Sequence, residues 1–259
     1  MASIERTAYP RFKHVPNQKE LNEVYTPTLQ EIAFAKGATR SPAYRFKLLV
    51  LLKAFQRLGY FPKLEEIPEQ IVQHIQICLR LQFRADLDYD HPRQLYRHHQ
   101  LIRTYLKVIP YGAYARHIAV RAVYQAAQVM NHPADLINVA IEELVKESCE
   151  LPAFKTLDEL SQRVRSLVNR QLFETTLQRL SSDEHQRLEQ LLELDPQRRR
   201  SQFSDLKQSP KRATVSHLRQ LQTRLAWLLE IANTESLLQG IPNSKVKHLA
   251  AELTFPDKS

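Results

Sequence analysis

The sequence predicts an all-α protein, and three observations predict this class. Only four glycines occur in 259 residues, and few segments alternate apolar and polar residues as strands do. Apolar residues instead recur at helical spacing along most of the chain. Hydrophobic residues make up 43% of the sequence, which is enough to build packed helical cores.

The best-delimited helix is predicted between Ser41 and Pro62. Ser41 can cap the helix, Pro42 suits its first turn, Gly59 favours a left-handed stop, and Pro62 prevents continuation. The polar residues of this segment form only a narrow sector: Arg45, Lys53, Gln56 and Arg57. A helix that is apolar on most sides is buried on most sides, so we expect the other helices to pack around it.

The remaining helices are predicted from apolar spacing and from proline and glycine punctuation. They are expected at about 17–35 with a break at Pro27, 68–81, 92–110, 116–130, 134–147, 157–180, 182–194 and 215–233. Residues 83–90 are predicted to be a polar loop. Thr156 and Glu159 have capping-box spacing, which predicts a helix that begins directly after Thr156.

The sequence Asn131-His132-Pro133 marks the clearest internal boundary, because asparagine and proline end one helix and proline begins the next. A helix, a turn containing Phe61-Pro62 and a second helix are echoed later around Leu151-Pro152, although this arrangement is common in any helical protein. We therefore expect tandem helix-turn-helix-like modules at 1–131 and 132–194, followed at 195–259 by a basic linker and a C-terminal helical segment.

The net charge of +9 and the pI near 9.6 favour a polyanionic partner, with nucleic acid as the leading candidate. Cys78 and Cys149 lie in apolar helical patterns and are expected to be buried, reduced thiols. The first 16 residues show neither a signal peptide nor a membrane anchor. We expect a cytoplasmic, nucleoid-associated protein without a membrane partner.

A strongly cationic segment runs from His91 to Ala134, where no Asp or Glu occurs. On a helix that begins at Pro92, four basic residues, Arg93, Arg97, Arg103 and Lys107, fall within an arc of roughly 120° that also contains Gln100 and Thr104, opposite an apolar side that can dock on a core. The residues predicted to contact DNA on this helix are Arg93, Arg97, Gln100, Arg103 and Lys107. The alternative is an ordinary solvated surface, although surface helices usually mix both signs of charge.

A second candidate face lies on the helix that follows Thr156. Leu157, Leu160, Val164, Leu167 and Val168 are expected to point inward. The residues expected to point outward toward base edges and phosphates are Gln162, Arg163, Ser166, Asn169 and Arg170. A third cationic stretch, from Arg198 to Arg212, contains six basic residues and can follow a phosphate backbone or stay flexible.

Signals for catalysis are weak, and no catalytic residue, metal ligand or cofactor is predicted. His98 and His99 are adjacent and so point in different directions; they are expected to be solvated or to contact phosphate. Glycine-rich phosphate loops, nucleophile elbows and HExxH motifs do not occur in the sequence. Glu142, Glu143 and Glu147 share one helix and are expected to pair with Lys146 or solvent.

Three segments resemble the N-terminal region of Tn3-family transposases, also catalogued as a domain of unknown function. They are RTAYPRF near the start, SPAYRFKLLVLLKAFQRLGYFP in the first core, and HPADLINVAIEELVKESCELPAFKTLDEL from His132 to Leu160. The resemblance implies tandem helical DNA-binding modules that recognise the terminal inverted repeats of a transposon. It also implies that the metal-binding acidic triad lies in a downstream RNase H-like domain, so we expect this chain to bind transposon ends without cutting them.

Two functional classes remain open from the sequence. The first is a module that binds double-stranded DNA at transposon ends. The second is a helical interaction or regulatory module that does not bind DNA specifically. In either case the apolar C-terminal helix can dock on the remainder of a transposase or on a second copy of this chain.

Overall fold

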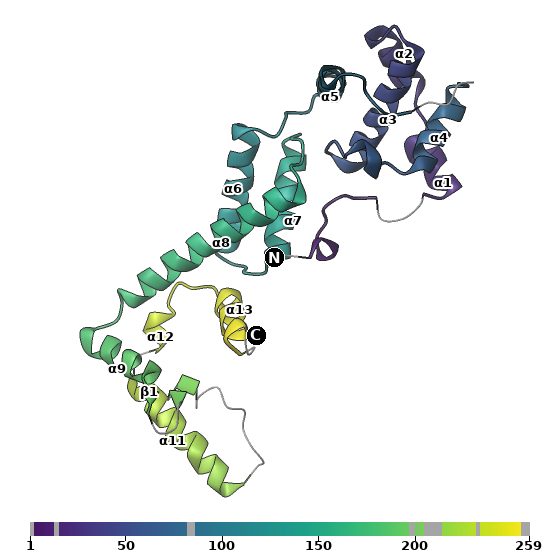
Figure 1. The fold of residues 1–259 in the computed structure, drawn as a ribbon. Coiled ribbons are helices and arrows are strands. Elements are labelled where there is room, and N and C mark those ends of the chain that lie inside the picture. Colours follow the sequence, from purple (N-terminus) through teal and green to yellow (C-terminus); the bar gives the residue numbers. More distant parts are fainter. Residues whose placement is uncertain are drawn as a thin grey trace. The chain divides into compact units, whose positions relative to one another are not determined.

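The computed structural model describes residues 3–12, 16–81, 86–196, 200–201, 203–204, 214–231 and 234–254. Helices dominate this part of the chain (Figure 1), and its strands are a two-residue antiparallel pair, β1 (Leu194–Asp195) and β2 (Arg200–Ser201). The prediction of an all-α protein is confirmed. The helix-turn-helix character of the modules stays a prediction.

Packing divides the chain into two compact units, and each is described by itself. The first comprises Met1–Val123 and Pro133–Ser161, and the second comprises Tyr124–His132 and Gln162–Ser259. The chain passes between them three times: within α6 (Ala113–Ala127), between His132 and Pro133, and within α8 (Phe154–Leu177). The predicted domain limits after residues 131 and 194 stay predictions.

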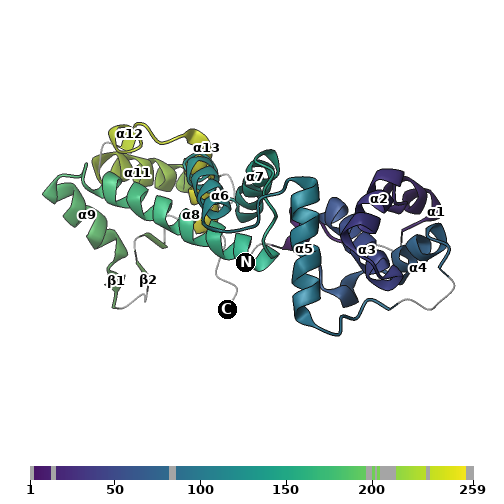
Figure 2. The ribbon, with the colours of Figure 1, turned by 90° about the horizontal axis from the view of Figure 1, so that it is seen from above.

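The core of the first unit is built around α3 (Pro42–Leu58), the helix that the sequence delimits best. Three helices pack against it (Figure 2): α2 (Leu29–Ala38), α4 (Glu69–Cys78) and α5 (Pro92–Leu106). Gly59 ends α3 with a φ of +72°, which confirms the predicted left-handed stop. Ser41 occupies the N-cap position, but its side chain forms no capping hydrogen bond.

Short elements precede and connect these helices. They are η1 (Ile4–Arg6), α1 (Gln18–Glu20), the π-helical turn η2 (Leu21–Tyr25) and η3 (Leu64–Glu66). The predicted break at Pro27 is confirmed. Thr28 then caps α2 reciprocally with Glu31: the Glu31 N–H donates to Thr28 Oγ1 at 3.2 Å, and the Thr28 N–H donates to Glu31 Oε2 at 2.7 Å.

One charged pair is buried against the polar sector of α3. Lys53 Nζ lies 3.0 Å from Glu31 Oε2, and both side chains are less than a tenth exposed. Gln56 Nε2 also donates to Glu31 Oε1 at 2.8 Å. Burial raises the pKa of Glu31, but the hydrogen bonds from Thr28, Gln56 and Lys53 outweigh it, so the net pKa is lowered and the carboxylate stays charged.

The first unit also contains α7 (Pro133–Lys146), the beginning of α6 and the beginning of α8. The segment after α7 joins distant parts of this unit: the Leu151 N–H donates to Gly59 O at 2.9 Å, and Ile109 pairs with Cys149 in a parallel bridge. The predicted capping box at Thr156 and Glu159 is wrong. The helix α8 begins at Phe154, and Thr156 already lies inside its first turn.

The described part of the second unit contains further helices. They are α9 (Ser182–Leu192), α11 (Val215–Ile231), α12 (Thr234–Leu237) and α13 (Asn243–Thr254). Helices α9 and α11 pack together, and Leu191 is buried against a small apolar cluster. Most of the predicted linker 195–212 lies outside the described residues. No helix in the described ranges is long and apolar enough to cross a membrane.

Candidate nucleic-acid interface

Helix α5 is anchored on the core of the first unit by one side of its surface. His98 and Ile102 are buried in this side. The partly buried residues that pack on the same core are Leu95, Leu101, Tyr105 and Leu106. These contacts fix the rotation of the helix about its axis, so the opposite side faces solvent.

The solvent-facing side of α5 exposes Arg93, Arg97 and Gln100, as the sequence predicts. Tyr96 belongs to the same side and is 69% exposed. The helix contains no carboxylate, so its own sequence offers these arginines no partner. We call Arg93, Tyr96, Arg97 and Gln100 the α5 face. Tyr96 was not predicted, although its helical position within the basic arc is a signal that could have identified it.

The two other predicted residues of α5 lie at the margin of this face. Arg103 forms an ion pair with Glu150: its Nε donates to Oε2 at 2.8 Å, and its Nη2 donates to Oε1 at 3.3 Å. The Arg103 guanidinium also lies 5.0 Å from the centre of the Phe61 ring. Lys107 is exposed and ends α5 with a left-handed φ of 56°. Arg103 therefore has contacts that stabilise the fold, whereas Lys107 is exposed to solvent.

The adjacent residues His98 and His99 were predicted to be solvated or to contact phosphate. The prediction that they are solvated is wrong. His98 is 4% exposed, and its Nδ1 lies 2.6 Å from the Tyr89 hydroxyl. His99 is half-buried and stacks on Phe61 with ring centres 3.8 Å apart. Burial is the main cause that lowers the pKa of each ring to about 4, with neighbouring cations adding to it, so both rings are neutral at pH 7.

The second candidate face lies on α8, within the second unit. Arg163, Ser166 and Arg170 are exposed there, while Gln162 is half-buried. Leu157, Leu160, Val164 and Val168 of the same helix are buried as predicted. The prediction for Leu167 is wrong, because it lies at the flank of the apolar arc and is 47% exposed. The two faces belong to different units.

Asn169, the remaining predicted residue of α8, is half-buried and contacts a hub at Asn131. Asn169 Nδ2 donates to Asn131 Oδ1 at 3.1 Å, and Arg165 Nη1 donates to the Asn131 carbonyl at 3.3 Å. Lys245, which is fully buried, donates to the same Asn131 Oδ1 at 2.8 Å. The Asn169 amide therefore holds α8 against the residues that follow α6, and its contact with DNA stays a prediction.

A groove of about 520 Å³ opens beside the α5 face, between α5 and the turn that joins α2 to α3. It is lined by Gly37, Ala38, Thr39, Arg40, Ser41, Tyr44, Gln94, Arg97 and His98. Arg40 was not predicted as a site residue, because a turn has no periodic pattern that marks which side chains share a surface. We call this hollow the Arg40 groove.

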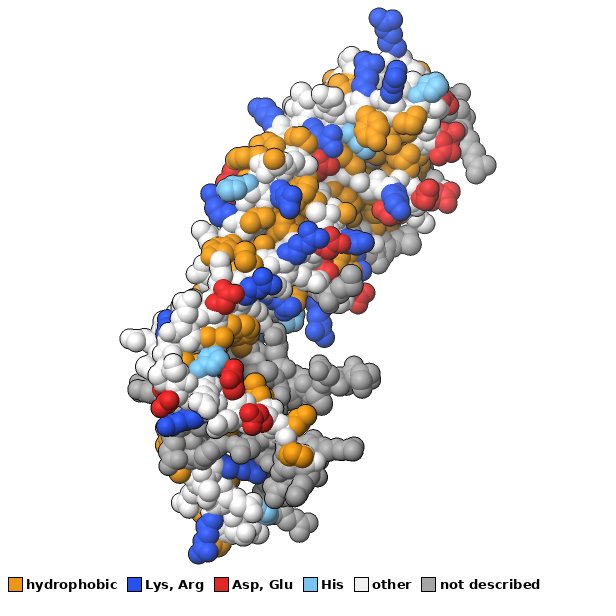
Figure 3. All heavy atoms as spheres, turned by 60° about the vertical axis from the view of Figure 1, so that its left-hand side comes forward, with side chains coloured by type: hydrophobic (Ala, Val, Ile, Leu, Met, Phe, Trp, Pro, Cys, Tyr) orange, Lys and Arg blue, Asp and Glu red, His pale blue; other side chains and the backbone are white. Residues whose placement is uncertain are grey.

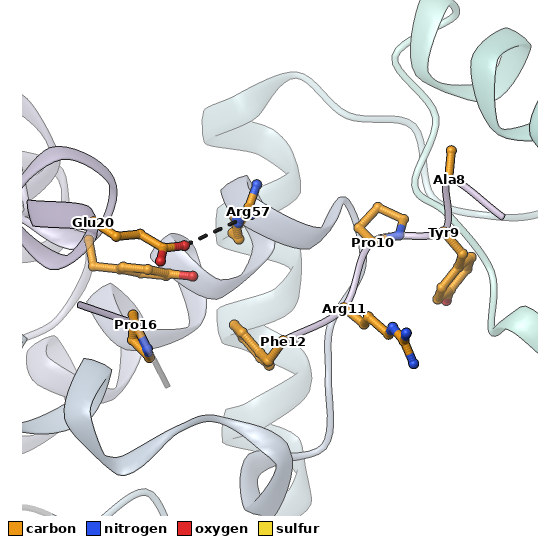
Figure 4. A pocket seen from close by; sticks show the side chains of 9 residues that line it. Ala8, Tyr9, Pro10, Arg11, Phe12, Pro16, Glu20 and Arg57 are labelled. Atoms are coloured by element: carbon orange, nitrogen blue, oxygen red, sulfur yellow. Dashed lines mark ion pairs between the residues drawn. The ribbon is translucent and has the colours of Figure 1, made fainter. Parts of the chain in front are cut away.

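A second hollow, of about 300 Å³, lies between residues 8–12, which we call the N-terminal arm, and the end of α3 (Figure 4). Its arginine Arg57 faces the carboxylate of Glu20 at 3.9 Å, and Arg11 pairs with Glu5 at 3.5 Å. Both basic groups are thus partly neutralised by carboxylates. This distinguishes the second hollow from the Arg40 groove.

Figure 3 shows Lys and Arg side chains scattered over one face of the molecule among hydrophobic ones, with fewer acidic groups between them.

Within the described ranges, no three His, Cys, Asp or Glu side chains gather in a way that could hold a metal ion. Both cysteines are free thiols, as predicted. Cys149 is buried as expected, whereas Cys78 is only half-buried.

The first unit thus exposes arginine, tyrosine and amide side chains on one helix that is anchored on its core. The chain belongs to the family described as a domain of unknown function (DUF4158), whose profile matches residues 1–164. No curated protein matches the chain.

Proposed function

We propose that this chain binds double-stranded DNA as the N-terminal region of a Tn3-family transposase, and that its target is the terminal inverted repeat of the transposon. The family to which it belongs is known from transposase N-terminal regions. The observation that carries the proposal is the α5 face: two exposed arginines, an exposed tyrosine and an exposed amide on a helix that has no carboxylate and is fixed on the core.

In this proposal the two faces have different tasks. The α5 face contacts phosphates, because arginine binds phosphate oxygens at any sequence. The exposed side chains of α8 contact base edges, where a good bidentate contact discriminates between bases by about 1–3 kcal/mol. Affinity then arises mainly from the first unit, and sequence preference arises mainly from the second.

Binding of a fluorescent duplex across a series of salt concentrations tests the proposal. Each neutralised phosphate is expected to contribute about −0.9 to the slope of log K against log salt, so several contacts give a steep decrease. Binding that is absent, or that does not respond to salt, would contradict DNA binding and favour a helical interaction module instead.

Competition between an inverted-repeat duplex and a scrambled duplex tests the division of tasks. Arg163→Ala is expected to reduce the preference for the inverted repeat more than it reduces binding to scrambled DNA. Lys155→Ala is the matched control on the same helix. The Lys155 side chain is 78% exposed, and its ion pair with Glu159 is long, at 3.9 Å, so its loss should disturb the fold little. An equal loss on both duplexes would assign Arg163 to phosphates.

We also propose that residues 1–259 bind DNA without cutting it, since the resemblance assigns strand chemistry to a downstream domain. Incubation of the purified chain with transposon-end DNA and Mg²⁺ or Mn²⁺ is expected to leave both strands intact. Metal-dependent nicking that persists through purification would contradict this.

A further inference from the structure

We propose that the Arg40 groove is a binding site for one phosphate group, held between Arg40 on the turn after α2 and Arg97 on α5. If the phosphate belongs to a DNA backbone, this inference rests on the function proposed above and places one contact. A free inorganic phosphate offers the same tetrahedral, anionic oxygens, and the experiment separates the two sources.

The first reason is the pairing of cations from two separate elements around one hollow. Arg40 and Arg97 are both exposed, both line the groove, and neither forms an ion pair with a described residue. Guanidinium groups bind phosphate oxygens through two parallel N–H groups, which makes arginine better suited than lysine to such a contact. Arg40 thus supplies a second cation next to the α5 face from a different element, the turn after α2.

The second reason is the supply of uncharged donors on the walls. The Ser41 hydroxyl lines the groove and forms no capping hydrogen bond with α3. The Arg45 N–H already donates to Ser41 O at 3.0 Å, and Pro42 has no N–H, so the N–H groups of Ala43 and Tyr44 stay unpaired at this helix end, and of these two residues Tyr44 lines the groove. These groups add donors and a positive partial charge to the arginines, and do not constitute the site alone.

The third reason is His98, which lines the groove although it is almost wholly buried. Its Nδ1 is engaged by the Tyr89 hydroxyl, and Nε2 has no partner among the described residues. If the tyrosine donates to Nδ1, then Nε2 carries the hydrogen and can donate it to an anion.

The walls of the groove also carry groups that do not assist an anion. The Tyr44 hydroxyl donates to Asp90 Oδ2 at 2.9 Å, so it is already engaged and brings one carboxylate nearby. The Thr39 hydroxyl donates to Ala35 O at 2.9 Å. Two arginines against one exposed carboxylate leave the groove cationic.

Arg40→Gln tests the site, because Arg40 lies outside the α5 face and its exposed side chain can be replaced without disturbing the core. Inorganic phosphate and duplex DNA are titrated separately into isotopically labelled protein, while the amide resonances of Ser41, Ala43 and Tyr44 are followed. Lys19→Gln is the control, because it removes the same charge from an exposed residue of the first unit. The ion pair of Lys19 with Glu23 is long, at 3.9 Å, and solvent-exposed, so its loss should disturb the fold little. Thermal unfolding of each variant verifies that the fold is retained.

A second measurement uses duplexes in which one phosphate at a time is replaced by a neutral methylphosphonate. For the wild type, one position is expected to weaken binding about five- to tenfold, and Arg40→Gln should weaken the unmodified duplex by a similar factor. For Arg40→Gln the same position should lose its effect, because the arginine that reads that charge is gone.

The outcomes separate the two proposals. Wild-type binding of the duplex with no effect of Arg40→Gln on any position would overturn the phosphate site and leave DNA binding intact. Phosphate-induced shifts at the three amides that Arg40→Gln abolishes, without binding of the duplex, would support a site for free phosphate and overturn DNA binding. Absence of both responses would overturn both proposals.

Discussion

Arg103 and Glu150 are joined by two hydrogen bonds across 47 positions of the sequence, and the Glu150 side chain is only 11% exposed. The pair fastens α5 to the segment that follows α7. It therefore gives Arg103 a structural role beside the DNA contact predicted for it.

Replacing Arg103 by Ala is expected to lower the free energy of unfolding by about 1–3 kcal/mol, because a nearly buried carboxylate loses its partner. Chemical denaturation measures this change. Glu150→Gln with Arg103→Gln keeps both side chains but removes both charges, so the double variant should be more stable than Arg103→Ala. A stability equal to that of the wild type for Arg103→Ala would contradict the structural role and leave only the DNA contact.

The double change Arg93→Ala with Arg97→Ala is expected to weaken binding to every duplex, irrespective of sequence. Two lost phosphate contacts should make the slope of log K against log salt less steep by about 1.8, at roughly 0.9 for each contact. Fluorescence anisotropy across a salt series measures the slope, and Lys19→Gln serves again as the control. If affinity and slope do not change, the α5 face does not contact DNA.

Lys245→Met is expected to destabilise the second unit. The ammonium of Lys245 donates to Ala127 O at 2.8 Å, to Met130 O at 3.2 Å and to Asn131 Oδ1 at 2.8 Å, so a thioether leaves three buried acceptors with one partner fewer each. The expected loss is about 2–4 kcal/mol. Faster amide hydrogen exchange in residues 124–131 measures it.

Lys247→Met is the matched control for this prediction, because Lys247 is exposed and lies two residues further along α13. It should leave the exchange rates unchanged. Equal effects of the two substitutions would show that loss of charge on α13, and not the buried contacts, causes the change.

The buried histidines predict that acid destabilises the first unit. Because His98 and His99 have a pKa near 4 when folded and an ordinary value of 6.5 when unfolded, the unfolded chain binds protons first as the pH decreases. The free energy of unfolding should therefore decrease between pH 6.5 and pH 5, by up to about 1.4 kcal/mol per pH unit for each ring. His74, whose pKa burial also lowers, contributes with the same sign.

His99→Phe preserves an aromatic ring to stack on Phe61 and removes one titrating group. Between pH 6.5 and pH 5, the free energy of unfolding should then decrease less steeply with pH, because unfolding of the variant takes up about one proton fewer. An unchanged pH dependence would show that His99 is accessible to protons in the folded protein.

The sequence predicted the fold class and the limits of several helices, because these depend on local signals. Pro42 and Gly59 act on their own backbone, and the spacing of apolar residues on α5 determines which side of that helix is buried. The same spacing correctly placed Arg93, Arg97 and Gln100 in solvent. Whether they contact DNA is a question that spacing cannot answer.

The rest of the candidate site depends on residues that are far apart in the sequence. Neither Glu150 beside Arg103 nor Phe61 beneath His99 can be identified from α5 alone, so the ion pair was missed and the histidines were expected to be solvated. Arg40 joins Arg97 only because the turn after α2 is folded against α5. The capping box failed for a local reason, since the helix begins one turn earlier at Phe154 than the Thr156 signal indicates.

The hydrogen bonds made by residues 151 and 152 have a consequence for synthesis on the ribosome. Gly59 O accepts from the Leu151 N–H, and Tyr9 in the N-terminal arm donates its hydroxyl to Pro152 O at 2.8 Å. The core around α3 can assemble as soon as α5 has emerged from the exit tunnel. The N-terminal arm and the end of α3 cannot form these hydrogen bonds until α6, α7 and residues 151 and 152 have been synthesised. A nascent chain arrested before residue 151 should therefore remain sensitive to proteases near Tyr9, and one arrested well beyond residue 152 should not.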